Sequence, residues 1–415
     1  RRQAHFRTGA TAARSLALCT ESSTPWYRVS DVLGGEEVSE TGRVKFTFPV
    51  GYHPFHANQV FNFQLNRWHS LGFVRKDEIE KIGSEIKTFD DYVHGFMQLG
   101  DKALAENRLQ NAAFYYRAAE FLVDPEDTRK IPLYNKFQEL FYRAFADDGI
   151  EQHKVPYAGG FLPAMRLTPK GVKKGTLVAF GGFDSFIEDF YCMWDFFAEA
   201  GYEVIAFEGP GQGGALRTYG IPFDHDWEKP TAAILDHFKV NDATLLGVSM
   251  GGYWGIRAAA FEKRITRVIA LPPVYDWMEM AGGFNRGLVD RLLKMRGLMN
   301  WMVKMKMSNG KLKHTINQTL FLTKKSEPID AVEWMMGMNK DHLHSELVTQ
   351  DVLLAGGEHD AFQPPMLMEK QRKALVNAKS VTVRVFTKAE HADQHCQIGN
   401  IGLALQVMLD WMEKK

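Results

Sequence analysis

The sequence predicts an α/β fold in which a mostly parallel sheet is flanked by helices, and three observations predict it. Short, almost continuously apolar runs recur along the second half of the chain, as in strands that are buried on both faces. Segments with helical spacing separate these runs, which is the pattern of parallel strands joined by crossover helices. One run ends in a glycine-flanked serine that opens the next helical segment, giving a strand–turn–helix sequence.

The predicted strands begin with an antiparallel pair around Gly159–Gly160, and the remaining strands are parallel. These strands are His153–Ala158, Phe161–Thr168, Leu177–Phe180, Glu203–Glu208, Ala243–Val248, Arg267–Leu271, Asp351–Ala355 and Val381–Phe386. The helices that follow strands are expected to begin near Glu188, Asp226, Met250, Pro365 and Cys396.

Two helical additions to the sheet are predicted. Residues 56–150 form a helical N-terminal domain, because apolar residues recur at helical spacing from Tyr92 to Val123. The interval 274–349 is too long for an ordinary connection between two strands and is predicted to be an inserted helical lid. The sheet domain then consists of residues 151–273 and 350–415, and residues 1–55 stay unassigned.

The predicted lid holds ten of the chain's 18 methionines, among them Met295, Met302 and Met305. Methionine adapts to irregular apolar partners, so a wall facing the substrate is one interpretation, and Trp277 and Phe284 are the side chains predicted to contact substrate there. A methionine stripe at helical spacing is more often part of an ordinary core, so no single methionine is predicted to bind substrate. The basic residues between 291 and 313 are expected to face solvent.

The composition is that of a folded protein, with 45% hydrophobic and 24% charged residues. The formal net charge of +0 gives no overall field that would attract nucleic acid, so no nucleic-acid partner is predicted. No apolar run approaches the ~18 residues that span a bilayer, and no membrane partner is predicted.

The three cysteines, Cys19, Cys192 and Cys396, are too few and too widely spaced for a disulfide framework or a zinc signature. No metal and no cofactor are predicted, and a reducing compartment, the cytoplasm, is expected. The alternative is an organelle, because the opening segment has four arginines and no acidic residue before Glu21. A tail without fixed structure would account for the same composition.

The strongest chemical signal is the sequence Gly247-Val248-Ser249-Met250-Gly251, which follows an apolar run and precedes a helical one. This is the context of a nucleophile elbow, in which a strained turn exposes the serine at the carboxyl edge of the sheet. The flanking glycines remove side chains that would collide across the turn. Ser249 is therefore the predicted nucleophile.

An acid and a base must follow Ser249 in the chain, because serine needs a base to take its proton. Asp360 follows the strand Asp351–Ala355 and is the predicted acid, with Glu358 as the alternative. Two histidines, His391 and His395, follow the last strand. Spacing alone does not separate them, but His395 lies at the start of the final helix and is favoured.

The oxyanion formed during acyl transfer needs two N–H donors. The amide of Met250 is the first, and the amide of Phe183, in the loop Gly181-Gly182-Phe183-Asp184 after the first parallel strand, is the second. Gly182 lets the backbone approach the substrate closely. Asp184 and Glu188 are expected either to hold this loop at the substrate or to cap the helix that follows.

The segment Gly209-Pro210-Gly211-Gln212-Gly213-Gly214 matches a dinucleotide-binding pattern and follows a strand. A dinucleotide site would need free amides at the start of a helix. Pro210 has no amide hydrogen, and Pro222 interrupts any helix soon afterwards, so a nucleotide is not predicted.

Taken together, these motifs and the ending His395-Cys396-Gln397 resemble α/β-hydrolases with a helical N-terminal extension. The group includes 2,6-dihydroxypseudooxynicotine hydrolase and the polyketide-shortening hydrolases of melanin biosynthesis, with FrsA-like esterases as more distant relatives. The resemblance covers roughly residues 90–415. It implies an α/β-hydrolase fold, the triad Ser249, Asp360 and His395, and a homodimer. His391 departs from the small residue expected in such an ending.

The resemblance also implies a reaction. Members often cleave a carbon–carbon bond beside a ketone, as in a β-diketone, and others cleave esters. For a β-diketone the leaving enolate needs a polar clamp, which Tyr275, Asp276 and Glu279 are placed to supply, unless they cap a lid helix.

The predicted function is therefore acyl transfer to Ser249 from a small-molecule, polyketide-like substrate with an apolar or aromatic group. A carboxylesterase or thioesterase is the alternative within enzymes. A catalytically silent ligand-binding homologue and a helical-repeat adaptor are the alternatives outside them.

Overall fold

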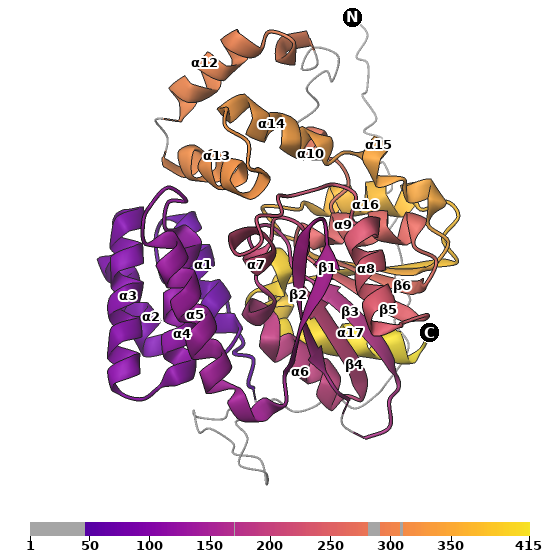
Figure 1. Ribbon diagram of the computed structural model, residues 1–415, viewed down its shortest axis with the longest axis horizontal. Helices are drawn as coiled ribbons and strands as arrows, with labels where there is room; N and C mark the ends of the chain where they lie inside the picture. The colour runs from indigo at the N-terminus through magenta and orange to yellow at the C-terminus, as the bar shows by residue number, and fades with distance from the viewer. Residues whose placement is uncertain (1–45, 170, 281–290, 308–309) are drawn as a thin grey trace, which may run out of the picture. The chain divides into compact units, whose positions relative to one another are not determined.

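The computed structural model describes residues 46–169, 171–280, 291–307 and 310–415. Its centre is an eight-stranded sheet with the order β1-β2-β4-β3-β5-β6-β7-β8, shown in Figure 1. β1 and β2 form an antiparallel pair, β2 is also antiparallel to β4, and all other neighbours are parallel. The predicted α/β fold with a mostly parallel sheet is confirmed.

The observed strands match the apolar runs to within a few residues. They are β1 (Glu151–Tyr157), β2 (Gly160–Leu167), β3 (Gly175–Phe180), β4 (Tyr202–Phe207), β5 (Ala243–Val248), β6 (Ile265–Leu271), β7 (Asp351–Gly357) and β8 (Ser380–Phe386). The helices of the sheet domain are α6 (Tyr191–Glu199), α7 (Gly213–Arg217), α8 (Glu228–Phe238), α9 (Gly251–Phe261), α16 (Pro365–Ala374) and α17 (Ile401–Glu413).

The core has two layers, one on each face of the sheet. Side chains of β3 alternate between them: Leu177 and Ala179 pack with α6 and α17, and Val178 and Phe180 pack with α8 and α9. Every residue of β4 and β5 is buried. This double burial explains why the sequences of these strands are mostly apolar.

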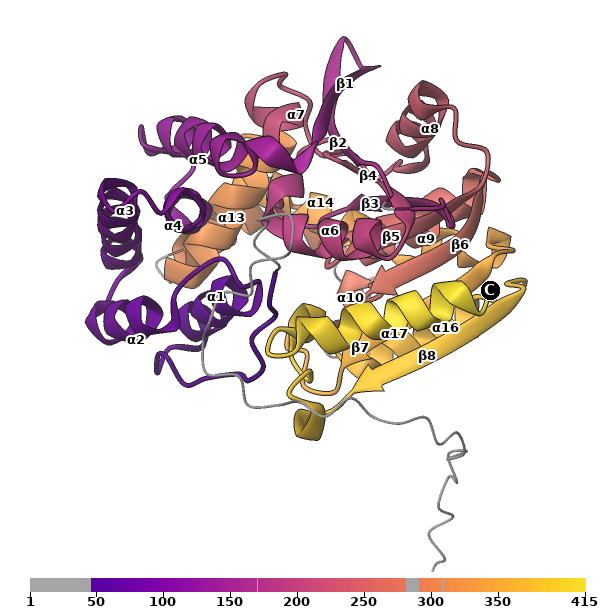
Figure 2. The ribbon, with the colours of Figure 1, turned by 90° about the horizontal axis from the view of Figure 1, so that it is seen from below.

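From residue 46 on, where the structure describes the chain, five helices precede the sheet: α1 (Gln59–Ser70), α2 (Lys76–Glu85), α3 (Phe89–Ala105), α4 (Leu109–Leu122) and α5 (Lys130–Ala144). In Figures 1 and 2 they form a bundle beside the sheet. Aromatic residues fill their shared core, and the rings of Phe73 and Phe114 stack with centroids 3.6 Å apart. We call α1–α5 the helical extension.

A second group of helices interrupts the sheet domain between β6 and β7. It comprises α10 (Trp277–Met280), α12 (Arg296–Lys306), α13 (Gly310–Thr323), α14 (Pro328–Gly337) and α15 (Lys340–Leu343). α13 lies beside the helical extension, whereas α12 lies on the far side of α14 from the sheet (Figure 1). We call residues 274–349 the insertion. No helix in the described part of the chain is long and apolar enough to cross a membrane.

The final helix begins later than predicted. It was expected at Cys396 and begins at Ile401, after a separate short turn at His395–Gln397. Cys396 and Gln397 both have positive φ values, +53° and +54°, which a helix does not accept. The side chain of Asn400 then caps the helix by accepting a hydrogen bond from the amide of Leu403.

Candidate active site

Ser249 occupies a strained turn between β5 and α9. Its φ is +60°, an uncommon value for a residue with a side chain, and its amide donates a 2.6 Å hydrogen bond to the carbonyl of Leu271. A Cβ at Gly247 would collide with the backbone of Gly251, and a Cβ at Gly251 would lie 2.8 Å from the carbonyl oxygen of Gly181. Both glycines are therefore required by the close packing of the turn.

Three side chains form a continuous hydrogen-bonded series at this turn. Ser249 Oγ lies 2.8 Å from His395 Nε2, and His395 Nδ1 lies 2.8 Å from Asp360 Oδ2. Asp360 is 3% exposed, and its other oxygen accepts 2.8 Å hydrogen bonds from the amides of Phe362 and Gln363. The carboxylate is thus fixed by two backbone donors, and it in turn orients the imidazole ring.

The protonation of His395 is governed by two opposing effects. Burial alone would lower the pKa of the imidazole, but the adjacent Asp360 carboxylate outweighs burial and raises the pKa to about 10. Asp360 therefore stabilises the imidazolium, the form that a histidine adopts after taking a proton from serine.

The alternative candidates for the acid and the base make their contacts away from Ser249. Glu358 accepts a hydrogen bond from the amide of Lys388, and His359 contacts Asp393 at 3.0 Å. His391 is exposed and has a φ of +57°. Among the described contacts, none of the three joins Ser249, so the structure brings His395 and Asp360 to the serine instead.

The loop after β3 passes directly over the turn that holds Ser249. A Cβ at Gly182 would lie 2.6 Å from the amide nitrogen of Met250 and 2.9 Å from Ser249 Cβ. Within the described residues, the amides of Phe183 and Met250 donate no hydrogen bond. Both amides are therefore available to an oxyanion beside Ser249.

Asp184 does not face open space. It is 1% exposed, and its carboxylate contacts Arg217 at 2.7 Å and Lys130 at 3.6 Å. The carboxylate also accepts a hydrogen bond from the side-chain NH2 of Gln318. These contacts hold the loop after β3 in place, and the predicted contact of Asp184 with substrate stays a prediction.

Glu188 is also buried, and its carboxylate accepts a hydrogen bond of 2.9 Å from the hydroxyl of Tyr142 in the helical extension. Burial raises the pKa of Glu188, and the neighbouring Asp189 raises it further. Like Asp184, Glu188 links the loop region to the helices beside it.

Two aromatic residues near the histidine were not predicted. The ring of Phe362 lies 5.0 Å from the ring of His395, and Phe63 of α1 lies 6.2 Å from His395 and 5.1 Å from Phe362. Phe362 is 42% exposed. Phe362 follows the predicted acid by two residues, which is a signal for it, but nothing in the sequence of α1 indicates that Phe63 approaches the site.

The predicted clamp residues have partners outside the triad. Asp276 lies just before α10 and accepts a long 3.5 Å hydrogen bond from the amide of Lys340, and Glu279 forms an ion pair with Lys370 of α16. Tyr275 and Trp277 are half-buried against the core beside α9. The remaining predicted residue, Phe284, lies outside the described residues.

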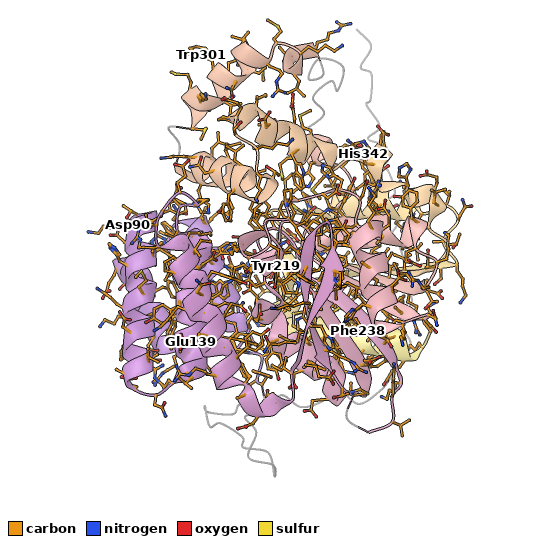
Figure 3. All side chains as sticks on the ribbon, viewed as in Figure 1. Asp90, Glu139, Tyr219, Phe238, Trp301 and His342 are labelled. Carbon is orange, nitrogen blue, oxygen red and sulfur yellow. The ribbon has the colours of Figure 1, made fainter. Side chains whose placement is uncertain are left out.

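The methionines of α12 do not form a wall toward a substrate. Met295, Met302 and Met305 are exposed, as is Trp301, which Figure 3 shows on the outer helix of the insertion. These residues therefore form neither a wall facing the substrate nor part of an ordinary core, because α12 packs on α14 through polar contacts. Arg296 pairs there with Asp330 and Glu333, and Lys304 pairs with Glu327. The basic residues thus face α14 in part, and the apolar ones face outward.

No group of three or more metal-ligating side chains occurs among the described residues. The glycines of the segment 209–214 have structural reasons: a Cβ at Gly209 would collide with the ring of Trp227, and Gly211 has a φ of +80°.

A family model described as "Alpha/beta hydrolase family" matches residues 180–394. The chain therefore belongs to the α/β-hydrolase family, and the predicted fold class is confirmed.

Individual relatives have low sequence identity to this chain. Hydrolyase ccsE of Aspergillus clavatus is 26% identical over 297 residues, which cover 61% of this chain and 66% of that protein. Hydrolyase poxO of Penicillium oxalicum is 28% identical over 242 residues, covering 53% of this chain and 55% of that protein. The matches thus span between half and two thirds of these relatives. The solved structure of a 2,6-dihydroxy-pseudo-oxynicotine hydrolase shares the fold, with a TM-score of 0.60 and 20% identity over 84% of this chain and 93% of that one.

Proposed function

We propose that this protein is a serine-dependent hydrolase that acts by acyl transfer through Ser249. The observation that carries the proposal is the series Ser249–His395–Asp360, with both distances at 2.8 Å and the serine held at a φ of +60°. A nucleophile that is strained and only partly buried, beside an oriented base, is the arrangement that acyl transfer needs.

In the first half of the reaction, Ser249 Oγ attacks the substrate carbonyl while His395 takes the serine proton. The negative charge that develops on the carbonyl oxygen is stabilised by the amides of Phe183 and Met250. When the intermediate collapses, the bond to the leaving group breaks, and His395 gives its proton to that group. The leaving group is an alkoxide for an ester and an enolate for a β-diketone.

In the second half, His395 takes a proton from water, and the resulting hydroxide attacks the acyl carbon. The bond from Ser249 Oγ to the acyl group breaks, the serine recovers its proton, and a carboxylic acid leaves. Because the base must be neutral at both attacks and its pKa is raised, kcat/KM is expected to increase with pH.

We further propose a carbon–carbon bond beside a ketone as the bond that is cleaved, in a substrate with an aromatic or apolar group. The rings of Phe63 and Phe362 beside His395 support the apolar group. The resemblance of the sequence motifs supports the bond type, and the name of the 2,6-dihydroxy-pseudo-oxynicotine hydrolase structure is compatible with a ketone substrate. An ordinary esterase acting on a bulky acyl group is the second candidate, because the same triad serves both.

The first experiment measures the intact mass of the protein after incubation with a fluorophosphonate, for the wild type and for Ser249→Ala. We expect one adduct on the wild type and none on the variant. Aryl esters and aryl β-diketones are then compared as substrates, and turnover of esters alone would favour the esterase. A wild type that forms no adduct and cleaves neither substrate would contradict the proposal and favour a ligand-binding protein.

A further inference from the structure

The glycine-rich segment 209–214 presents one polar side chain, Gln212, toward the loop after β3. Gln212 is 1% exposed. Its own turn is closed by the amide of Gln212, which donates to the carbonyl of Gly209, and by the amide of Gly209, which donates to Gln212 Oε1, both at 3.0 Å. The side-chain oxygen is thereby used within the turn, and the side-chain NH2 is directed outward from it.

The NH2 group of Gln212 holds two successive carbonyls of the neighbouring loop. Nε2 donates to the carbonyl of Gly181 at 2.8 Å and to the carbonyl of Gly182 at 3.0 Å. These residues are 30 and 31 positions earlier in the chain, and they form the stretch that passes over Ser249.

Holding a carbonyl also fixes the direction of the next amide. In a trans peptide the C=O and the following N–H point in opposite directions. The carbonyl of Gly182 points at Gln212, so the N–H of Phe183 points to the opposite side. The preceding peptide has the same orientation, and its N–H, on Gly182, is bonded to Ser185 Oγ at 3.1 Å. Of these two N–H groups, the N–H of Phe183 has no hydrogen-bond acceptor among the described residues.

We propose that Gln212 is a positioning residue that keeps the Phe183 amide directed at the oxyanion beside Ser249. The inference rests on the proposed acyl transfer and adds a function for the glycine-rich segment. Without the two hydrogen bonds, the Gly182 carbonyl keeps only a long 3.5 Å hydrogen bond from the amide of Ser185, so the Gly182–Phe183 peptide can rotate and its carbonyl would then face the site in place of its N–H. A carbonyl oxygen would repel the oxyanion and leave Met250 as the remaining backbone donor.

The test compares Gln212→Met with Gln350→Met. Methionine keeps the approximate length and volume of glutamine but has no donor. Gln350 is a matched control, because it is also buried and its Nε2 also donates to a backbone carbonyl at 2.8 Å, that of Ala259, away from Ser249. The wild type and both variants are assayed on the same aryl ester and titrated with an aryl trifluoromethyl ketone, which forms an oxyanion on Ser249, and with the product acid, which does not.

We expect Gln212→Met to lower kcat by about 10- to 100-fold, somewhat less than full removal of an oxyanion donor. KM and the affinity for the product acid should change by less than about twofold, while affinity for the trifluoromethyl ketone should fall in step with kcat. Gln350→Met should leave all four quantities near their wild-type values. A purely structural role of Gln212 would lower the two affinities together.

Several outcomes would overturn the inference. One is a Gln212→Met variant with wild-type kcat, and another is equal loss of affinity for the ketone and the acid. If Gln212→Met does not fold, as judged by circular dichroism, Gln212→Glu replaces it, since Glu keeps the Oε1 acceptor for Gly209 and loses the donor when ionised. A wild type without turnover or phosphonate adduct contradicts the proposed function itself, whereas an active wild type with an unaffected Gln212 variant contradicts only this inference.

Discussion

The helical extension and α12, the outer helix of the insertion, are both additions to one sheet, yet they are held by different kinds of contact. In the extension, Arg117 and Glu120 of α4 are completely buried, and Arg117 pairs with the buried Asp189 at 2.7 Å. Arg117 also donates to the backbone carbonyl of Asp184 at 2.7 Å, in the loop beside Ser249. In the insertion, α12 has no buried residue, and the side chain of Arg296, which pairs with α14, is 50% exposed.

A helix outside the sheet can thus still be part of the site. Buried charges cannot be removed singly without leaving a partner unpaired in a low-dielectric environment, so the extension and the loop after β3 depend on each other. Exposed ion pairs contribute little, because water and salt screen them. The extension is therefore expected to be a fixed wall of the site, and the outer part of the insertion a tolerant surface.

Arg117→Met is the most direct test of the contrast between the buried and the exposed ion pairs. The change leaves Asp189 and Glu120 without one of their cationic partners, and we expect the free energy of unfolding to fall by about 3 kcal/mol. Urea unfolding measures the loss. Arg143→Met is the matched control, because Arg143 lies in the same extension but is 54% exposed, and its pair with Glu139 should matter by less than about 1 kcal/mol. Similar losses for the two variants would contradict the contrast.

A second change tests whether the extension contacts the substrate. Phe63→Ala removes a ring that lies 6.2 Å from the ring of His395. We expect kcat/KM for a bulky aryl ester to fall about 10-fold, while an acetyl ester should be less affected because it does not reach the ring. Trp301→Ala serves as the control from the insertion, since Trp301 is 60% exposed on α12. An equal effect on both esters would mean that Phe63 only supports the fold.

The contact between the two additions provides a pH-dependent test. His314 of α13 stacks on Phe89 of α3 with ring centroids 5.2 Å apart, and burial lowers the pKa of His314 to about 4. The unfolded chain, with a histidine pKa near 6.5, binds a proton more readily, so this contact loses stability as the pH falls from about 6.5 toward 4. We expect His314→Phe to lose less stability than the wild type between pH 7 and pH 5 in urea unfolding. An unchanged pH dependence would show that His314 remains hydrated.

The smallest effect is expected on α12. Arg296→Met breaks the exposed pairs with Asp330 and Glu333, and the free energy of unfolding should change by less than about 1 kcal/mol. Activity on a soluble aryl ester should stay within about twofold of the wild type. A large loss in either measurement would show that the outer insertion is coupled to the site.

Local sequence patterns determined the strands and the reactive turn. The observed β5, Ala243–Val248, matches its predicted bounds, because an apolar run of strand length between turns needs no knowledge of its neighbours. The elbow at Ser249 was equally evident from its flanking glycines, since a Cβ at Gly247 would collide with the backbone of Gly251 only four residues away. The order of serine, acid and histidine along the chain then narrowed the candidates to Asp360 and a choice between two histidines.

Contacts between segments that are distant in sequence became evident only in the tertiary structure. It placed His395 rather than His391 at Ser249, brought Phe63 from α1 to the same site, and turned Met302 and Met305 of α12 outward. It also directed Gln212 to a loop 30 residues earlier. Periodicity and turns could be predicted from the sequence because they follow from neighbouring residues. Partners across the fold depend on how the helices and strands pack, and no local sequence pattern specifies that packing.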